Sequence, residues 1–385
     1  MRLQRIQLPN AGKALDMRID HGRSYILTKK NQNGILFCVT HKPSWHIKLP
    51  FQPSKIEKNE SGLFICGYHH IKDNKGRSLI RPNLALLKRN AKLTWHKTFF
   101  TEDKFNGHCL IWEIVALPND ECIIMLIIEM EDTYTLKHIR LSNAGEIIWE
   151  QALRSIQINP LYFYPQKITP RLFRKGPILY NVGAYVLENS PSATSIIGID
   201  IDEGSLKGTF KSNITNAFYT AAVQAPNGYI ATAWQPYGQT EGENGILLLS
   251  TKLKCVGEHR TPICAWSGMS WNGKSLLLAG RYKAQRRYHP AVQQIGSNKF
   301  TKTFTEHNLA SHVQLCDTVV TYLDKAEQED PIHRHALIVR NIQTDWIYRK
   351  EHASPISQPI LKQEGSHYSV VYSLEEKDTV LIKLS

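Results

Sequence analysis

The chain has 385 residues, of which 42% are hydrophobic and 21% charged, the composition of an ordinary globular protein with enough apolar material for a core. Its formal net charge of +13 comes from 47 Lys plus Arg against 34 Asp plus Glu, which favours an anionic partner, although a basic solvated surface has the same composition. The longest apolar run, CIIMLII at 122–128, is too short to cross a bilayer, MRLQRIQLPN lacks a secretory core, and the seven cysteines form no CxxC pair. We therefore expect a cytoplasmic protein with reduced thiols, without a disulfide framework or zinc ribbon.

The first predicted element is an outer strand at residues 2–9, RLQRIQLP, which aligns with WHIKLP at 45–50. The second sequence belongs to a phrase that recurs: an apolar run, a polar break and a strand bearing an aromatic residue. Its copies are VTHKPSWHIKLP (39–50), LLKRNAKLTWHKTF (86–99), IRLSNAGEIIWEQAL (139–153), QQIGSNKFTKTF (293–304) and IVRNIQTDWIYRK (338–350). This alignment places Trp45, Trp95, Trp149, Phe300 and Trp346 in one register, with Phe210 in the same place in 165–211. Such self-similarity indicates a repeat protein.

A second phrase precedes the first: a strand, a tight turn with Gly, Asn or Asp, and a strongly apolar strand. Examples are ALPNDECIIML (116–126), VQAPNGYIATAW (223–234), SWNGKSLLLAG (270–280) and LKQEGSHYSVVYS (361–373). The turn residues favour a tight reversal, and the flanking β-branched and aromatic residues favour pleated strands. No helical period of usable length is present. Each unit is therefore predicted to form four antiparallel strands.

Eight such units fill the chain, beginning near residues 14, 53, 110, 165, 218, 263, 308 and 355. Four-stranded units of about 48 residues are typical of a β-propeller. The sequence therefore predicts an all-β, eight-bladed propeller as the single domain of residues 1–385. The last unit has material for only three strands, so residues 2–9 complete it and close the ring without an exposed edge. Seven blades are the alternative if 165–211, which lacks the Trp, is not a blade.

The strand with the pattern "apolar, Lys, polar, turn, apolar, x, Trp", together with the Gly-turn strand, resembles the repeats of quinoprotein-like bacterial β-propellers. The repeats lack the Trp-Asp dipeptide of WD repeats. The resemblance covers nearly the whole chain and implies the fold. It carries no catalytic residue across, because propellers host enzymes and binding scaffolds alike.

The predicted ligand site lies on the face where the connections after the second and fourth strands of each blade emerge. Long loops there are the usual place for binding, and Arg side chains suit planar oxyanions because their fork donates two parallel hydrogen bonds. Two cationic loops, 68–83 and 280–291, and the neutral to acidic loop 234–245 lie on this face. The predicted ligand-binding residues are Arg77, Trp112, Tyr237, Trp266, Arg281, Arg287 and His289. The alternative is that these loops are a solvated rim and that the aromatic residues are core.

The residues predicted to carry catalysis, if there is any, are His108, Glu113 and His312 at the channel mouth. A carboxylate among aromatic side chains can act as an acid or base, and imidazole exchanges protons near neutral pH. The plainer interpretation is that Glu113 is the partner of a nearby Arg. His333 and His335 share one face of a strand, but two His alone are weak support for a metal, so we expect no metal. The absence of a P-loop, GxSxG, HExxH or GxGxxG pattern predicts no cofactor.

Three functions from different classes fit these features. The first is a binding propeller that presents a loop-rich, His- and Arg-rich face to a protein partner or an anionic ligand such as a saccharide. The alternative is a lyase, hydrolase or cyclase with a His/Glu/Arg site at the channel mouth. The third is a nucleic-acid binder, which the charge motivates but the scatter of basic residues disfavours. Whether the protein is an enzyme stays open at this point.

Overall fold

The structure is a computed structural model. It describes residues 2–31, 33–73, 75–100, 107–130, 133–156, 171–183, 195–212, 214, 217–236, 244–271, 275–284, 287–295, 300–304, 311–325, 335–375 and 377–385. Within these ranges, some side chains near strand ends are outside the description, and nothing is said of them.

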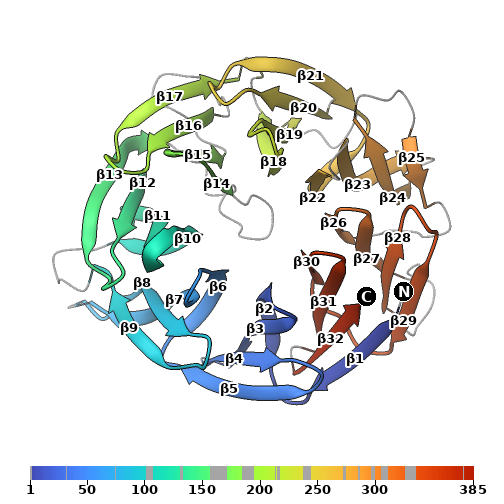
Figure 1. Cartoon of the computed structure of the whole chain (residues 1–385), viewed down its shortest axis with the longest axis horizontal. Coiled ribbons are helices and arrows are strands. Elements are labelled where there is room, and N and C mark those ends of the chain that lie inside the picture. Colours follow the sequence, from blue (N-terminus) through green and yellow to red (C-terminus); the bar gives the residue numbers. More distant parts are fainter. Residues whose placement is uncertain are drawn as a thin grey trace.

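The described residues form eight four-stranded antiparallel sheets arranged as the blades of a ring (Figure 1). The first four blades are β2(Lys13–Asp20) to β5(Pro43–Leu49) through β3(Arg23–Lys30) and β4(Asn33–Val39); β6(Gln52–Lys58), β7(Gly62–Lys72), β8(Ser78–Lys88) and β9(Leu93–Thr98); β10(His108–Ala116), β11(Cys122–Met130), β12(Thr133–Leu141) and β13(Ile147–Ile156); and β14(Arg171–Lys175), β15(Ile178–Gly183), β16(Ser195–Asp200) and β17(Leu206–Lys211). A short 3₁₀ turn, η1(Pro118–Asp120), lies between β10 and β11.

The other four blades continue around the ring. They are β18(Ala217–Gln224), β19(Ile230–Pro236), β20(Asn244–Leu249) and β21(Cys255–Thr261); β22(Cys264–Trp271), β23(Leu276–Ala284), β24(Arg287–Gln294) and β25(Phe300–Thr303); β26(Ser311–Cys316), β27(Val319–Lys325), β28(His335–Asn341) and β29(Ile347–His352); and β30(Ile360–Glu364), β31(His367–Leu374) and β32(Asp378–Leu384) with β1(Leu3–Leu8). In every sheet the hydrogen-bonded order runs from the innermost to the outermost strand. The eight-bladed prediction is confirmed, and because 171–211 form a complete blade, the seven-bladed alternative is wrong.

The N-terminal strand closes the ring. β1 pairs antiparallel with β32 over six residue pairs, from Leu3 with Leu384 to Leu8 with Thr379. The amide of Arg2 donates to the Ser385 carbonyl at 2.7 Å, and the two chain ends lie side by side in Figure 1. Ile6 and Leu8 are buried against the first blade. The predicted outer strand is therefore confirmed, and it ties the last blade to the first without a covalent bond.

The two faces of the ring carry different sets of connections between strands. Because the strands of a blade alternate in direction, the connections after the second and fourth strands share one face, called here the loop face. On that face, 353–359 is the longest connection that is described throughout. The longest described connections on the opposite face are 117–121, 142–146, 201–205, 225–229, 250–254 and 342–346.

Two segments expected as loops on that face are largely strands. In blade 2, β7 and β8 pair out to Lys72 with Ser78, so only 73–77 connect them. In blade 6, β23 and β24 pair out to Ala284 with Arg287. Polar side chains there gave a loop-like composition, yet the two strands of a ribbon pair with each other, and water can satisfy the backbone groups of its outer edges, so solvent exposure does not prevent pairing.

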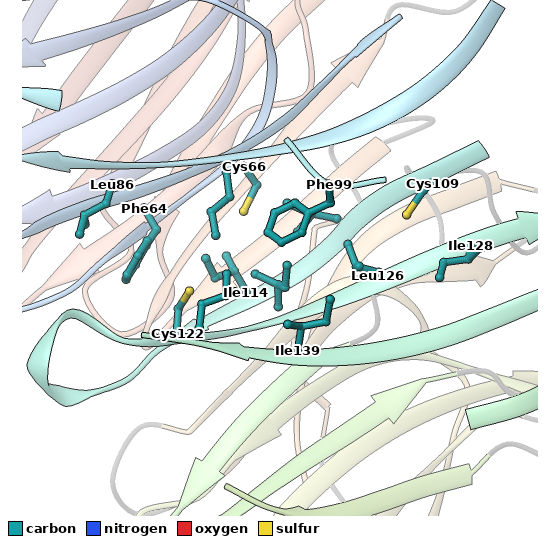
Figure 2. Close-up of a cluster of buried hydrophobic side chains, with 14 residues drawn as sticks. Phe64, Cys66, Leu86, Phe99, Cys109, Ile114, Cys122, Leu126, Ile128 and Ile139 are labelled. Carbon is teal, nitrogen blue, oxygen red and sulfur yellow. The ribbon is translucent and has the colours of Figure 1, made fainter. Parts of the chain in front are cut away.

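The apolar core lies between neighbouring blades. Figure 2 shows the cluster between blades 2 and 3, where Phe64, Cys66 and Leu86 face Leu126 and Ile139. Cys109 and Cys122 are buried in the same cluster. Burial raises the pKa of the Cys66, Cys109 and Cys122 thiols, which keeps them protonated and unreactive.

The repeated Trp joins one blade to the next. Trp95 of β9 donates from Nε1 to the Asn143 carbonyl at 2.7 Å, and Trp149 of β13 donates to the Ile201 carbonyl at 2.8 Å. Each indole covers a turn glycine of the following blade, Gly145 or Gly204, both in the left-handed region. A Cβ at Gly204 would lie 2.7 Å from the Trp149 ring. In the third blade, one copy of the phrase thus supplies both Trp149 and the turn that receives Trp95.

This register is not shared by all the expected residues. Trp45, Trp95 and Trp149 occupy the same position, the first pair after an irregularity in the outermost strand. Phe300 instead opens its strand, as Leu93 does, and Trp346 lies in the turn before β29. In blade 4 the position belongs to Gly208, not to Phe210. The predicted alignment is wrong for these three residues because an offset of two residues leaves the alternating pattern of a strand unchanged.

No helix in the described ranges is long and apolar enough to cross a membrane.

Candidate functional site

The innermost strands share a β-bulge that places polar side chains beside the ring's centre. The registers of β2, β6 and β10 shift between Ala14 and Asp16, between Pro53 and Lys55, and between Ile111 and Glu113. A bulge re-aims the side chains that follow it. As a result Asp16, Lys55 and Glu113 hold equivalent positions on three consecutive blades.

These side chains form a chain of contacts from blade to blade. Lys362 of β30 lies 3.8 Å from Asp16, and the Asp16 carboxylate accepts a hydrogen bond from the Ile56 amide at 3.2 Å. Lys55 forms an ion pair with Glu113 of the third blade. We call this set, with Arg18 and Glu57, the inner polar arc. It spans four innermost strands, β30, β2, β6 and β10, which surround the centre of the ring in Figure 1.

Arg18 is the central cation of the arc. Its guanidinium lies 2.7 Å from the Glu57 carboxylate and 3.3 Å from Asp16. Burial opposes ionisation of Asp16, but Arg18, Lys362 and the Ile56 amide outweigh burial, so the pKa of this carboxyl is below its usual value. Burial likewise opposes the charge on Arg18, and its acidic neighbours reverse that effect and raise its pKa. Asp16 and Arg18 are thus held in their ionised forms.

Glu113 lies within this arc and not at a strand start. It is the sixth residue of β10, its side chain is 8% exposed, and its carboxylate also accepts from the Ile114 amide at 3.3 Å. The plainer interpretation, a carboxylate paired with a cation, describes its surroundings, although the cation is Lys55 and not an Arg. Its predicted role as a general acid or base stays a prediction.

A second polar cluster supports the extended hairpin of blade 2. The Asn83 amide lies 2.6 Å from His69 Nδ1, and Asn83 Oδ1 lies 2.8 Å from His96 Nε2 and from Thr98 Oγ1. His96 also stacks on Phe51. Burial and the neighbouring His69 lower the pKa of His96, so the neutral ring is favoured. This set, with Arg81, is called the hairpin cluster.

Arg81 and His108 attach the hairpin to the strand that follows it. Arg81 is 1% exposed and donates to the Gly107 carbonyl at 2.7 Å. His108, at the first position of β10, accepts a hydrogen bond at Nδ1 from the Ile80 amide at 3.3 Å. His108 was predicted as a catalytic residue, and in the structure it fixes the position of a strand.

The tip of this hairpin presents cations on an ordered loop. Asp73 accepts hydrogen bonds from the amides of Lys75 and Arg77 at 2.9 and 2.8 Å, and from Arg77 Nε at 2.6 Å. Gly76, at φ +78°, completes the reversal. Lys72, Lys75 and Arg77 are exposed. The predicted ligand residue Arg77 therefore has a fixed side-chain direction, with its Nε used by Asp73.

The other predicted site residues lie on several blades. Arg281 is half-buried on β23, and His289, 8% exposed, is on β24. Trp112 occupies the bulge of β10 and packs against the core between blades 3 and 4. His312, Trp266, Arg287 and His335 lie on β26, β22, β24 and β28 with side chains outside the description, and Tyr237 and His333 fall outside the described residues. The structure brings together His108, Arg81 and the hairpin, and it does not place Arg77 beside Arg281.

Within the described part of the chain, no group of three or more His, Cys, Asp or Glu is arranged to hold a metal ion.

Sequence reasoning missed most of the inner polar arc and the hairpin cluster. A signal was present for the arc. Asp16 and Arg18 are spaced i, i+2 on β2, whose other residues are largely apolar, and Lys55 and Glu57 have the same spacing on β6. Such spacing places charges on one side of a strand. What the spacing omits is the identity of the partner, which belongs to the next blade.

Comparison with known proteins gives the fold alone. No family model and no curated protein matches the chain. It is similar to a puromycin hydrolase, an S511A mutant complexed with PGG, with a TM-score of 0.54 and 10% identity over 94% of this chain and 59% of that chain. The chain thus spans 59% of the length of that hydrolase.

Two further solved structures have lower TM-scores. They are the polysaccharide lyase Uly1 (0.48, 11% identity, 99% of both chains) and a europium-containing methanol dehydrogenase (0.44, 8% identity, 96% of this chain and 81% of that chain). The fold that the predicted resemblance implies, a β-propeller, is the one observed. At such identities no activity transfers to this chain.

Proposed function

We propose that the protein is a binding propeller that presents its loop face to an anionic ligand or to a protein partner with an acidic surface. The observation that supports this most is the contrast between its two sets of charges. The charges of the inner polar arc contact one another across blade junctions. Those of the blade 2 hairpin tip, Lys72, Lys75 and Arg77, are exposed, and Asp73 accepts a hydrogen bond from Arg77 there.

The enzyme alternative requires His108 and Glu113 to be available to a substrate. Both are engaged in the described structure, with the Ile80 amide and with Lys55 respectively. A general base whose carboxylate is held by a lysine must first break that pair to accept a proton. We therefore place the enzyme second.

The nucleic-acid alternative rests on the net charge, and the distribution of that charge argues against it. Exposed cations occur on the outermost strands of five blades, namely Arg5, Lys48, Lys207, Lys211, Arg260, Arg349 and Lys350. Each of those strands has one unpaired edge, and Lys or Arg on an edge prevents strand-to-strand association with another molecule. Much of the positive charge is thereby accounted for without a nucleic acid.

The test is to locate where an anion binds. An oligoglutamate peptide and inorganic phosphate are titrated by calorimetry at low and physiological salt, and hydrogen exchange is then measured with the bound probe. We expect slower exchange in 68–81 and no change in the turns 58–62 and 141–147 of the opposite face. Binding that protects those turns, or no binding of any anionic probe, would contradict the proposal.

A further inference from the structure

The blade 2 hairpin extends beyond the strands on either side of it. β7 and β8 pair as far as Lys72 with Ser78. On the inner side, β6 pairs with β7 only as far as Gln52 with Tyr68. On the outer side, β9 pairs with β8 only as far as Thr98 with Asn83. The ribbon formed by 69–72 and 78–82 therefore has two edges beyond the ends of its neighbouring strands.

The outer edge, on β8, is occupied by other groups at Ile80 and Pro82. The Ile80 amide donates to His108 Nδ1, and the Ile80 carbonyl accepts from Arg81 Nη1 at 3.1 Å. Pro82 has no N–H, and its carbonyl accepts from the Phe99 amide at 3.0 Å. A strand approaching this edge would find these backbone groups occupied.

The inner edge, on β7, differs, because no described strand pairs with it beyond Tyr68. Because the Ile80 backbone groups point away from β7, Ile80 and His70 form a non-hydrogen-bonded pair, and the His70 N–H and C=O point away from β8. By the same alternation, the N–H and C=O of Lys72 and Tyr68 also point away from β8. Of these residues, Tyr68 is paired with Gln52 of β6. Among the described residues, no backbone hydrogen bond reaches this side of His70 or Lys72.

Cations surround this inner edge. Lys72 belongs to it, and Lys75 and Arg77 lie on the adjoining tip, where Asp73 fixes the loop. The hairpin cluster holds the base of the ribbon, since Asn83 bonds His69 of one strand and Thr98 of the neighbouring strand. An edge held in place in advance lowers the entropic cost of binding an extended chain.

We propose that the β7 edge at His70 and Lys72 binds an extended acidic peptide segment of a partner protein, which adds to blade 2 as a fifth strand. This inference rests on the proposed function and names the partner's chemistry. Peptide N–H and C=O groups match the alternating acceptors and donors of the edge, and Glu or Asp side chains match Lys72, Lys75 and Arg77. A nucleic-acid backbone offers phosphates but no regularly spaced N–H donors, so it leaves the His70 and Lys72 carbonyls unmatched.

The test compares two proline variants at opposite edges of the ribbon. His70→Pro removes an N–H from the inner edge, and Ser78→Pro removes one from the outer edge. Both lose the same contact between His70 Nδ1 and Ser78 Oγ, so they are matched, and both positions are edge positions where Pro is tolerated. Circular dichroism and thermal melting check that each variant folds. The probe is a fluorescein-labelled peptide of alternating Glu and Thr, eight residues long, followed by anisotropy.

We expect His70→Pro to weaken binding about tenfold, which corresponds to ~1.4 kcal/mol, the size of one backbone hydrogen bond. Ser78→Pro is expected to stay within about twofold of the unmodified protein. A peptide methylated at every backbone nitrogen keeps its charge and should lose binding to the unmodified protein.

Other results separate this inference from the proposed function. If both proline variants and the methylated peptide bind normally while Lys72→Ala/Lys75→Ala weakens binding, the contact is purely electrostatic: strand addition is wrong and the proposed function stands. If an eight-residue oligothymidylate binds and the peptide does not, the acidic-peptide partner is wrong. If neither peptide, phosphate nor oligonucleotide binds, both proposals fail.

Discussion

Acid should weaken the junction between blades 3 and 4 through one histidine. His138 of β12 is 0% exposed, and its Nε2 lies 2.8 Å from Nδ2 of Asn181 on β15. An amide nitrogen is a donor, so Nε2 must accept, and the proton of the neutral ring is on Nδ1. No described group pairs with that Nδ1. Protonation of His138 would place an N–H at Nε2 against the N–H of the Asn181 amide. Burial lowers the pKa of His138 to about 4.

The sign and size of the effect follow from linkage. Below the ordinary pKa of 6.5 an unfolded chain binds a proton at this position, and the folded protein does not until the pH reaches about 4. The free energy of unfolding therefore falls as the pH drops from 6.5 to 4 and changes no further below that. The full loss is about 3 kcal/mol, of which roughly 2 kcal/mol is lost by pH 5.

The measurement is urea unfolding at pH 7.5 and pH 5.0, followed by Trp fluorescence and circular dichroism. His138→Gln keeps an acceptor for Asn181 and removes the titration, so its loss of stability between the two pH values should be smaller by roughly 2 kcal/mol. His367→Gln, at an exposed histidine, is the matched control and should behave as the unmodified protein does. Burial, with Lys350 and Arg5 nearby, also lowers the pKa of His352 to about 4, so some acid sensitivity should persist in His138→Gln. Equal losses in His138→Gln and the unmodified protein would refute the reasoning.

Four further predictions concern single contacts. Gly204→Ala should destabilise the protein more than Gly176→Ala by about 1–2 kcal/mol. Both glycines have positive φ, but only at Gly204 would a Cβ meet the Trp149 ring. Equal urea midpoints for the two variants would contradict the contact between Trp149 and this turn. Lys55→Met should cost about 2–4 kcal/mol because Glu113 is left buried and unpaired, and Lys55→Met/Glu113→Leu should recover most of it; a double variant as unstable as the single one would count against this account. Deleting residues 1–9 removes the closing strand with the buried Ile6 and Leu8, so the melting temperature of the truncated protein should fall by several degrees. Leu8→Ala alone should cost about 2–4 kcal/mol of stability. An unchanged melting temperature after the deletion would exclude closure by β1. Asp73→Ala makes the protein more positive yet should weaken peptide binding severalfold because Arg77 and the tip lose their anchor, whereas binding that tightens would indicate that net charge alone matters.

The blade count and the closure followed from the sequence because both are written in local patterns. Alternating apolar residues and tight turns recur in every unit, and RLQRIQLP has the pattern of the other outermost strands. Strand pairing within a blade links residues that are near in sequence, so the repeat predicts it directly. The register was harder: Phe300 lies two residues before the position that corresponds to Trp95, and an offset of two residues leaves the alternating pattern of a strand unchanged.

The same limit applies to the candidate site. Composition marked 68–83 as polar and cationic, and this indicated the loop face, but it could not separate the exposed Arg77 from the buried Arg81. Arg81 is buried where it donates to the carbonyl of Gly107, a residue that directly precedes the next blade. The difference in exposure between the two arginines therefore depends on a contact with another blade. Likewise, Asp16 and Lys362, or Lys55 and Glu113, meet only because the ring closes and brings neighbouring innermost strands together. The sequence by itself determined the blades, since each is a local unit; only the tertiary structure decided which charges are paired and which face solvent, because those contacts cross from one blade to another.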